Sequence, residues 1–189
     1  GYHFKGRSDT EVILNLYLKY GLELVNKLNG IFAFAIWDSR KDQLFLARDG
    51  MGVKPLYYSE TSKGFLFASE IKAILKESSV SREINPVALA SHITYLWSPA
   101  PSTMLKSVKK LEPGSAIVVG KGKVNNKWIF YKPILNHQIT NISVNDAKIS
   151  VRKSIKTAVE RQMISDVPVG AFLSGGLDSS AITAFARDK

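Results

Sequence analysis

Cysteine is absent from the 189 residues of this sequence, and histidine is scarce. Without cysteine there are no disulfide bonds, no thiolate metal ligands and no cysteine nucleophile within these residues. His3, His92 and His137 lie too far apart for the spacing of a zinc site. No apolar run approaches the length of a membrane span, and the first residues lack the basic and apolar regions of a signal peptide. We therefore expect a cytoplasmic protein with no membrane partner.

Acidic residues are outnumbered by basic ones, 16 to 26, which gives a formal net charge of +10. Such an excess can indicate nucleic-acid binding. The lysines are scattered, however, with small groups at 106–110 and 121–127, and no basic stripe is interleaved with aromatic residues. We interpret the charge as a solvated surface and expect no nucleic-acid partner. A non-catalytic binding module, whose nucleic-acid affinity would fall steeply with salt, is the alternative.

Strand and helix signals divide the chain into a β-rich first part and an α/β second part. Apolar runs bounded by turn residues predict strands at 30–37, 43–47, 56–58, 64–69, 115–119 and 126–131. Helical spacing predicts helices that begin after Ser8, Asn85 and Ser143 and around Glu70, and that end near residues 20, 96, 163 and 76. The strand at 30–37 carries no charge, which predicts a central place in its sheet.

These signals also predict the domain organisation. We predict one domain over residues 1–132, a linker at 133–142, where the patterning is weak, and a second domain over 143–189. The chain starts at Gly1 rather than Met and stops one predicted helix after a glycine turn. We therefore expect an internal fragment of a longer protein.

The glycine turn near the end of the chain is its most informative stretch. Residues 167–180 read Val-Pro-Val-Gly-Ala-Phe-Leu-Ser-Gly-Gly-Leu-Asp-Ser-Ser. The apolar run 171–173 is typical of a strand in a parallel sheet, and Gly175-Gly176 permit a tight turn close to a ligand. Helical spacing of apolar residues after Asp178 predicts a helix, whose first N–H groups and positive dipole end suit phosphate.

This stretch resembles the pyrophosphate loop of the ATP pyrophosphatase (PP-loop) enzymes. It is not a P-loop, because no Gly-Lys-Ser/Thr follows the first glycine at the required distance. PP-loop enzymes cleave ATP between the α and β phosphates. The resemblance implies an ATP and pyrophosphate site made of Leu173, Ser174, Gly175, Gly176, Asp178, Ser179 and Ser180. Asp178 either holds Mg²⁺ or orders the loop, and a tight turn without a ligand is the alternative interpretation.

Motifs of the first part resemble the later half of a class II glutamine amidotransferase domain. They are Gly-Arg-Ser-Asp-Thr-Glu-Val-Ile-Leu (6–14), Leu-Asn-Gly-Ile-Phe-Ala-Phe-Ala (28–35), Arg-Asp-Gly-Met-Gly-Val-Lys-Pro-Leu-Tyr-Tyr (48–58) and Ala-Ser-Glu-Ile-Lys-Ala (68–73). With the Ser-Gly-Gly-Leu-Asp-Ser-Ser loop behind them, the arrangement is similar to that of glutamine-hydrolysing asparagine synthetases. Nearly the whole chain is covered by this resemblance.

The resemblance implies a fold class. The first part is expected to be an α+β glutaminase of the N-terminal nucleophile hydrolase type, with antiparallel sheets and helices, of which only the C-terminal part is present. An α/β PP-loop domain with a parallel sheet is expected to begin after it. The family's nucleophile is an N-terminal cysteine, so the resemblance places no catalytic residue within this chain.

The implied activity is ATP-dependent asparagine synthesis from aspartate. Glutamine supplies the ammonia, an aspartyl-adenylate forms, and AMP and pyrophosphate are released. The implied cofactors are ATP and Mg²⁺, the other substrates are glutamine and aspartate, and the implied assembly is a homodimer. The alternative is a related adenylating amidotransferase that acts on another carboxylate and forms a cell-surface sugar amide or a lactam.

The resemblance also assigns a role to Asp9, whose position in the family binds the amino group of glutamine. Ser8 and Glu11 form a predicted capping box, in which Ser8 caps the helix and Glu11 returns a hydrogen bond. Because the cap is complete without it, Asp9 is available to a ligand, although a carboxylate there also favours the helix dipole. Arg48 and Asp49 are predicted to be structural, as part of the family's hairpin loop.

Overall fold

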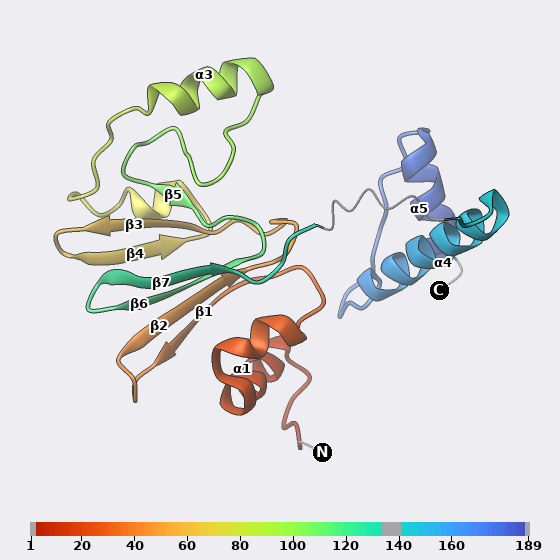
Figure 1. The fold of residues 1–189 in the computed structure, drawn as a ribbon, viewed down its shortest axis with the longest axis horizontal. Coiled ribbons are helices and arrows are strands. Elements are labelled where there is room, and N and C mark those ends of the chain that lie inside the picture. Colours follow the sequence, from red (N-terminus) through yellow and green to blue (C-terminus); the bar gives the residue numbers. More distant parts are fainter. Residues whose placement is uncertain (1–2, 134–140, 188–189) are drawn as a thin grey trace. The chain divides into compact units, whose positions relative to one another are not determined.

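The computed structural model describes residues 3–133 and 141–187. The chain forms two compact units, residues 1–134 and 135–189. The first unit contains the β-sheets, and the second contains the helices α4 and α5 (Figure 1). Most of the linker predicted at 133–142 lies outside the described residues, so the predicted domain boundaries stay predictions.

The larger sheet of the first unit is antiparallel and has the strand order β1-β2-β6-β7. Its strands are β1 (Ala33–Asp38), β2 (Gln43–Arg48), β6 (Ser115–Gly120) and β7 (Lys123–Ile129). Because β1 lies at the edge of this sheet, the prediction of a central strand at 30–37 is wrong. Its apolar composition has another cause: Phe34 and Ile36 pack toward the helices, while Trp37 is 59% exposed.

The smaller sheet is also antiparallel and has the order β4-β3-β5. Its strands are β3 (Tyr57–Thr61), β4 (Gly64–Ala68) and β5 (Lys109–Lys110). A hairpin joins β3 to β4, with Tyr58 opposite Phe67. The predicted α+β architecture with antiparallel sheets is therefore confirmed for the first unit.

Helices begin where the sequence places capping side chains. The capped helices are α1 (Asp9–Tyr20), α3 (Pro86–Tyr95) and α4 (Val144–Gln162), and the others are η1 (Gly21–Lys27), α2 (Ile71–Ile74) and α5 (Leu177–Arg187). Ser8, Asn85 and Ser143 each accept hydrogen bonds from backbone N–H groups of the first turn, which confirms the three predicted caps. Among residues 3–133 and 141–187, no helix has the length and apolarity needed to cross a membrane.

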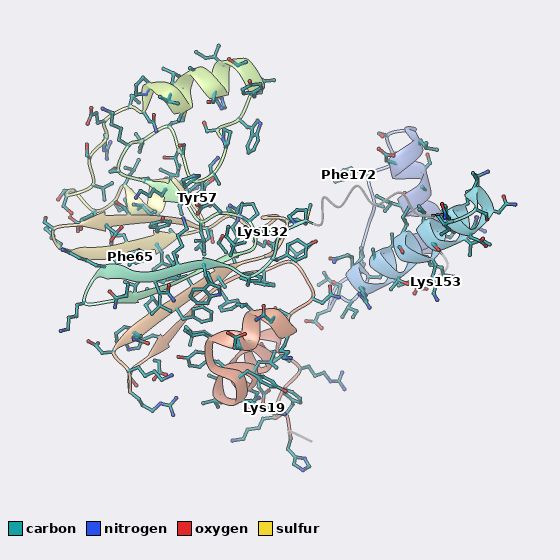
Figure 2. All side chains as sticks on the ribbon, in the orientation of Figure 1. Lys19, Tyr57, Phe65, Lys132, Lys153 and Phe172 are labelled. Atoms are coloured by element: carbon teal, nitrogen blue, oxygen red, sulfur yellow. The ribbon has the colours of Figure 1, made fainter. Side chains whose placement is uncertain are left out.

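Alternate residues of β2 and β6 face opposite layers of the first unit. One set packs against α1 and η1, in a cluster of Phe45, Ala47, Ala116, Val118, Tyr17, Leu24 and Val25. The other set packs against the smaller sheet, in a cluster of Leu46, Ile117, Val119, Leu56, Tyr58 and Leu111. Phe65, labelled in Figure 2, packs against this second cluster. Residues around α2 cover the far face of the smaller sheet, so the first unit is an α/β/β/α sandwich (Figure 1).

The turn after β2 connects the two sheets. Arg48 donates to three backbone carbonyls, those of Lys54, Leu111 and Gly52, at 2.6–2.7 Å. Asp49 is 1% exposed, and its carboxylate accepts hydrogen bonds from the backbone N–H groups of Met51, Val53 and Lys54 at 3.0–3.1 Å. These contacts give Arg48 and Asp49 the structural role that the sequence predicts.

Glu70 and Lys72 precede and open α2, and the sequence leaves two interpretations of them open: a buried pair, or a helix-start acid and a surface lysine. The structure pairs Lys72 Nζ with Glu70 Oε2 at 2.6 Å, and the two side chains are 80% and 59% exposed. The pair is therefore a surface pair, and the buried interpretation is wrong. An exposed ion pair of this kind contributes little to stability.

In the second unit, α4 and α5 contact each other, and the strand expected at 171–173 does not form. A strand requires hydrogen bonds to a neighbouring strand. The described residues of this unit, 141–187, contain helices and loops, so the run has no partner. Phe172, labelled in Figure 2, is accordingly fully exposed.

Candidate functional site

The first candidate residue, Asp9, opens α1, and the packing of α1 fixes its position. Tyr17, on the third turn of α1, is 6% exposed and stacks on Phe45 of β2 at 6.2 Å between ring centroids. The Tyr17 hydroxyl donates a hydrogen bond to Asp38 Oδ2 at the end of β1, at 3.0 Å. One side chain of α1 therefore makes both an apolar and a polar contact with the larger sheet.

Electrostatics favour a neutral Tyr17 beside an ionised Asp38. Burial raises the pKa of Tyr17, and the hydrogen bond to Asp38 raises it further. Burial also raises the pKa of the Asp38 carboxyl, but hydrogen bonds from Arg40 and Tyr17 outweigh this effect and lower the pKa overall. The phenol is therefore the donor and the carboxylate the acceptor at neutral pH.

The first turn of α1 differs from the predicted capping box. Ser8 Oγ accepts from Thr10 N at 3.2 Å, so Ser8 caps the helix as expected. Glu11, however, does not return a bond to Ser8. Its two carboxylate oxygens accept from Lys5 N and Gly6 N, each at 2.8 Å. The side chain reaches past the cap because the preceding segment bends across the first turn and presents nearer donors.

Asp9 is exposed at the start of α1. Its Oδ1 accepts a long hydrogen bond of 3.4 Å from Thr10 Oγ1. Because Ser8 supplies the cap, the Asp9 carboxylate can accept charge-assisted hydrogen bonds from an incoming ammonium group. This geometry suits the amino group of an amino acid.

The second candidate site, residues 173–180, lies in the second unit. Gly175 has a φ of +81°, a left-handed conformation that favours glycine, and it turns the chain into α5. Ser174 Oγ lies 2.9 Å from Ser179 Oγ, and Gly176 N donates to Ser174 Oγ at 3.4 Å. Ser180 N donates to the Gly176 carbonyl, which closes the first turn of the helix.

The structure brings the predicted loop residues together at the start of α5. The first N–H groups of a helix have no partner within it, and its N-terminal end carries a partial positive charge. Serine hydroxyls and these N–H groups therefore lie at one place, which suits a polyanion. In the structure, Ser179 Oγ donates to the Gly176 carbonyl at 3.1 Å. Leu173 and Leu177, on either side of the turn, are 61% and 86% exposed.

Asp178 lies in the first turn of α5 and is exposed. In the parts of the chain that the structure describes, no group of three or more His, Cys, Asp or Glu residues could hold a metal ion. Mg²⁺ is commonly held by one or two carboxylates together with substrate phosphates and water. A single carboxylate beside this glycine and serine turn therefore fits Mg²⁺ that arrives with a nucleotide.

Sequence reasoning missed the contacts of Glu11 and Tyr17. Glu11 matched the capping-box pattern, and no sequence signal shows that an earlier segment offers it closer donors. The helical spacing of apolar residues in α1 is consistent with the packing of the Tyr17 ring, but it says nothing about the hydroxyl. The partner of this hydroxyl, Asp38, follows 21 residues later, and no local pattern connects the two residues.

The two candidate sites lie in different parts of the structure, because Asp9 belongs to the first unit and the loop 173–180 to the second.

Comparisons with known proteins match both parts of the chain. The family described as "Glutamine amidotransferase domain" matches residues 1–131, and the family described as "Asparagine synthase" matches residues 150–189. Glutamine-hydrolyzing asparagine synthetase 3 of Bacillus subtilis (strain 168) is 42% identical over 187 residues, which cover 98% of this chain and 30% of that protein. Amidase chyE of Penicillium rubens is 30% identical over 190 residues, which cover 99% of this chain and 28% of that protein.

A solved structure of glutamine phosphoribosylpyrophosphate amidotransferase from B. subtilis, complexed with ADP and GMP, also matches. It has a TM-score of 0.46 and 16% identity, and the match covers 100% of this chain and 39% of that one. The chain spans about 30% of the length of the first curated relative.

Proposed function

Because this chain belongs to the glutamine amidotransferase domain family and continues into a segment that matches the asparagine synthase family, we propose that its protein makes asparagine. Glutamine supplies ammonia, and aspartate is activated by ATP as an aspartyl-adenylate, with release of AMP and pyrophosphate. The observation that carries this proposal is the order of the two family segments in one chain. The similarity to an asparagine synthetase over 98% of the chain supports it.

At the glutamine end, Asp9 is proposed to bind the substrate's amino group. The exposed carboxylate at the start of α1 would accept charge-assisted hydrogen bonds from the ammonium. The buried Tyr17–Asp38 contact keeps α1 against the larger sheet. A helix held in this way presents its first turn with a fixed orientation, which suits a binding residue.

At the ATP end, the loop 173–180 is proposed to hold the phosphates. Ser174 and Ser179, whose hydroxyls lie 2.9 Å apart, would donate to phosphate oxygens together with the first N–H groups of α5. Asp178 is the proposed ligand of Mg²⁺. When bound, the metal neutralises charge on the departing pyrophosphate.

The chemistry explains why the two segments belong together. A carboxylate is a poor electrophile, and adenylation gives it a good leaving group. Ammonia released into water would be protonated and would lose its nucleophilicity, so a shielded route between two domains of one protein is an advantage.

A second activity stays open, because an amidase is among the similar proteins. In this alternative, the same two segments serve a related adenylating amidotransferase that acts on another carboxylate, such as a cell-surface sugar acid or a lactam precursor. The residues of the acceptor site would distinguish the two activities.

Other features of the proposed enzyme rest on the family. We propose that the run 171–173 becomes a strand of a parallel sheet where neighbouring strands pair with it, and the full exposure of Phe172 is consistent with an unpaired strand. A cytoplasmic location and a homodimer are proposed on the same basis.

An isotope-transfer assay tests the proposed function. The intact protein would receive ATP, Mg²⁺, aspartate and glutamine labelled with heavy nitrogen in its side-chain amide. We expect labelled asparagine together with equal amounts of AMP and pyrophosphate. Labelled product from another carboxylate, with none from aspartate, would favour the alternative. ADP and phosphate in place of AMP and pyrophosphate would contradict the assignment of the loop.

A further inference from the structure

Two carboxylates lie in the first turn of α1, and they have different partners. Glu11 uses both of its oxygens, because Oε1 accepts from Lys5 N and Oε2 accepts from Gly6 N, each at 2.8 Å. Successive backbone N–H groups that converge on one anion form a nest. Glu11 therefore fills a nest made by the segment that precedes its own helix.

This contact closes a short loop over the start of α1. At one end, Glu11 binds the backbone of Lys5 and Gly6; at the other, Ser8 Oγ accepts from Thr10 N at 3.2 Å. A Cβ added to Gly6 would lie 3.3 Å from Glu11 Oε2, so glycine permits the close approach. Both ends of the segment between Lys5 and Thr10 are thus attached to the helix.

Asp9 lies within this closed loop. Its carboxylate accepts the 3.4 Å hydrogen bond from Thr10 Oγ1, whereas the Glu11 carboxylate is fully engaged by two short ones. The two carboxylates therefore differ in what they can bind. Glu11 binds the backbone of Lys5 and Gly6, whereas Asp9 can accept hydrogen bonds from a ligand. Gly6 and Lys5, whose N–H groups Glu11 binds, lie three and four residues before Asp9.

We propose that Glu11 is a positioning residue for the glutamine site, and that it orients Asp9 by binding the backbone of Lys5 and Gly6. The inference rests on the proposed function, because it takes Asp9 as the residue that binds the amino group of glutamine. A purely structural cap would have a different consequence, since loss of Glu11 would then lower stability and leave the affinity for glutamine unchanged.

The test uses the intact protein and the variants Glu11→Ala, Glu11→Gln, Asp9→Asn and Glu23→Gln. Glu23 is the matched control, because its carboxylate also accepts a side-chain hydrogen bond, from Asn26 Nδ2, but lies in η1. Two quantities are measured for each protein: kcat and KM for glutamine hydrolysis, and the rates of hydrogen exchange of the Lys5 and Gly6 amides.

Loss of Glu11 is expected to raise KM for glutamine about tenfold, since one misdirected charge-assisted contact has roughly that effect. The value of kcat should stay within about twofold, because the residue acts on binding. Exchange of both amides should accelerate. Glu11→Gln should raise KM less than Glu11→Ala does, because its amide oxygen still accepts one of the two bonds. Glu23→Gln should behave as wild type.

The outcomes separate this inference from the proposed function. Faster amide exchange in Glu11→Ala with a wild-type KM would overturn the positioning role. If Glu11→Ala does not fold, the same comparison of amide exchange and KM is made with Glu11→Gln, and faster exchange with a wild-type KM would again overturn the positioning role. A wild-type KM in Asp9→Asn would overturn the proposed role of Asp9, and wild-type protein that releases no ammonia from glutamine would contradict the proposed function itself.

Discussion

At the scale of single residues, Asp178 is proposed to serve the ATP chemistry alone. It lies in the first turn of α5, beside the serine turn and in a different unit from Asp9. A change at this carboxylate should therefore affect ATP chemistry without affecting glutamine hydrolysis.

We predict that Asp178→Ala in the intact protein lowers pyrophosphate release at least about 100-fold, because the charge on the departing group loses its stabilisation. Glutaminase activity should be retained. Asp166→Ala, which removes another exposed acid of the same unit, is the control and should leave both activities intact. Pyrophosphate release at the wild-type rate by Asp178→Ala would defeat the assignment.

Glu77 gives a prediction about acid stability. Hydrogen bonds from the Ser79 backbone N–H and from Lys63 lower the pKa of Glu77 from 4.5 to about 2. A lowered folded-state pKa contributes stability that is present above the unfolded pKa and is lost as the pH falls through the folded one. This contribution should therefore be complete above about pH 5 and disappear between pH 4.5 and about pH 2.

Urea unfolding of wild type and Glu77→Gln at a series of pH values measures this contribution. Wild type should be more stable at neutral pH, and the difference should shrink as the pH falls toward the folded pKa. Lys63→Met removes one of the partners and should reproduce part of the effect. A difference that stays constant with pH would show that the charge of Glu77 is irrelevant to stability.

At the scale of elements, features that neighbouring residues set could be predicted from the sequence. Features that depend on pairing between distant residues could not. The caps at Ser8, Asn85 and Ser143 were predictable because a capping side chain acts within three residues of its own position. The edge position of β1 was not, because strand order depends on pairing between distant segments, such as β2 with β6. An apolar run alone therefore cannot distinguish an edge strand that packs on a helix from a central one.

The same contrast between neighbouring and distant residues explains which parts of the candidate site could be predicted. The glycine and serine turn before α5 was predictable from adjacent residues, and the structure gathers those residues at one helix start. The backbone partners of Glu11 were not predictable, because they depend on how the segment before Ser8 bends back.

The close packing beside the Asp49 turn leads to a prediction for Gly114. This residue has a φ of +63°, its N–H donates to Asp49 O at 2.8 Å, and an added Cβ would collide with the carbonyl oxygen of Tyr131. Gly114→Ala should lower the free energy of unfolding by at least about 2 kcal/mol, because left-handed strain and displaced backbone both contribute.

Tryptophan fluorescence during urea unfolding can report this change, since Trp128 stacks on Phe45 in the core at 5.8 Å. Gly30→Ala is the control, because an added Cβ there meets nothing within 4 Å and its φ is not positive. Equal stability of Gly114→Ala and Gly30→Ala would contradict the packing described for this turn.

At the scale of the whole molecule, a sheet-bearing unit carries Asp9, and a helical unit carries the glycine and serine turn that is proposed to hold phosphate. The two family segments follow one another along the chain, residues 1–131 and then 150–189, and this order is the basis of the proposal that the protein couples glutamine to ATP. The first unit is proposed to bind glutamine through Asp9. Synthesis from free ammonia would not require glutamine binding at Asp9, whereas synthesis from glutamine would.

The most direct measurement is therefore the synthesis of asparagine by Asp9→Asn in the intact protein, with glutamine and with ammonium as alternative nitrogen sources. We predict that KM for glutamine rises at least about tenfold, because a charge-assisted contact is lost, while synthesis from ammonium keeps the wild-type rate. A wild-type KM for glutamine, or an equal loss with both nitrogen sources, would contradict the account.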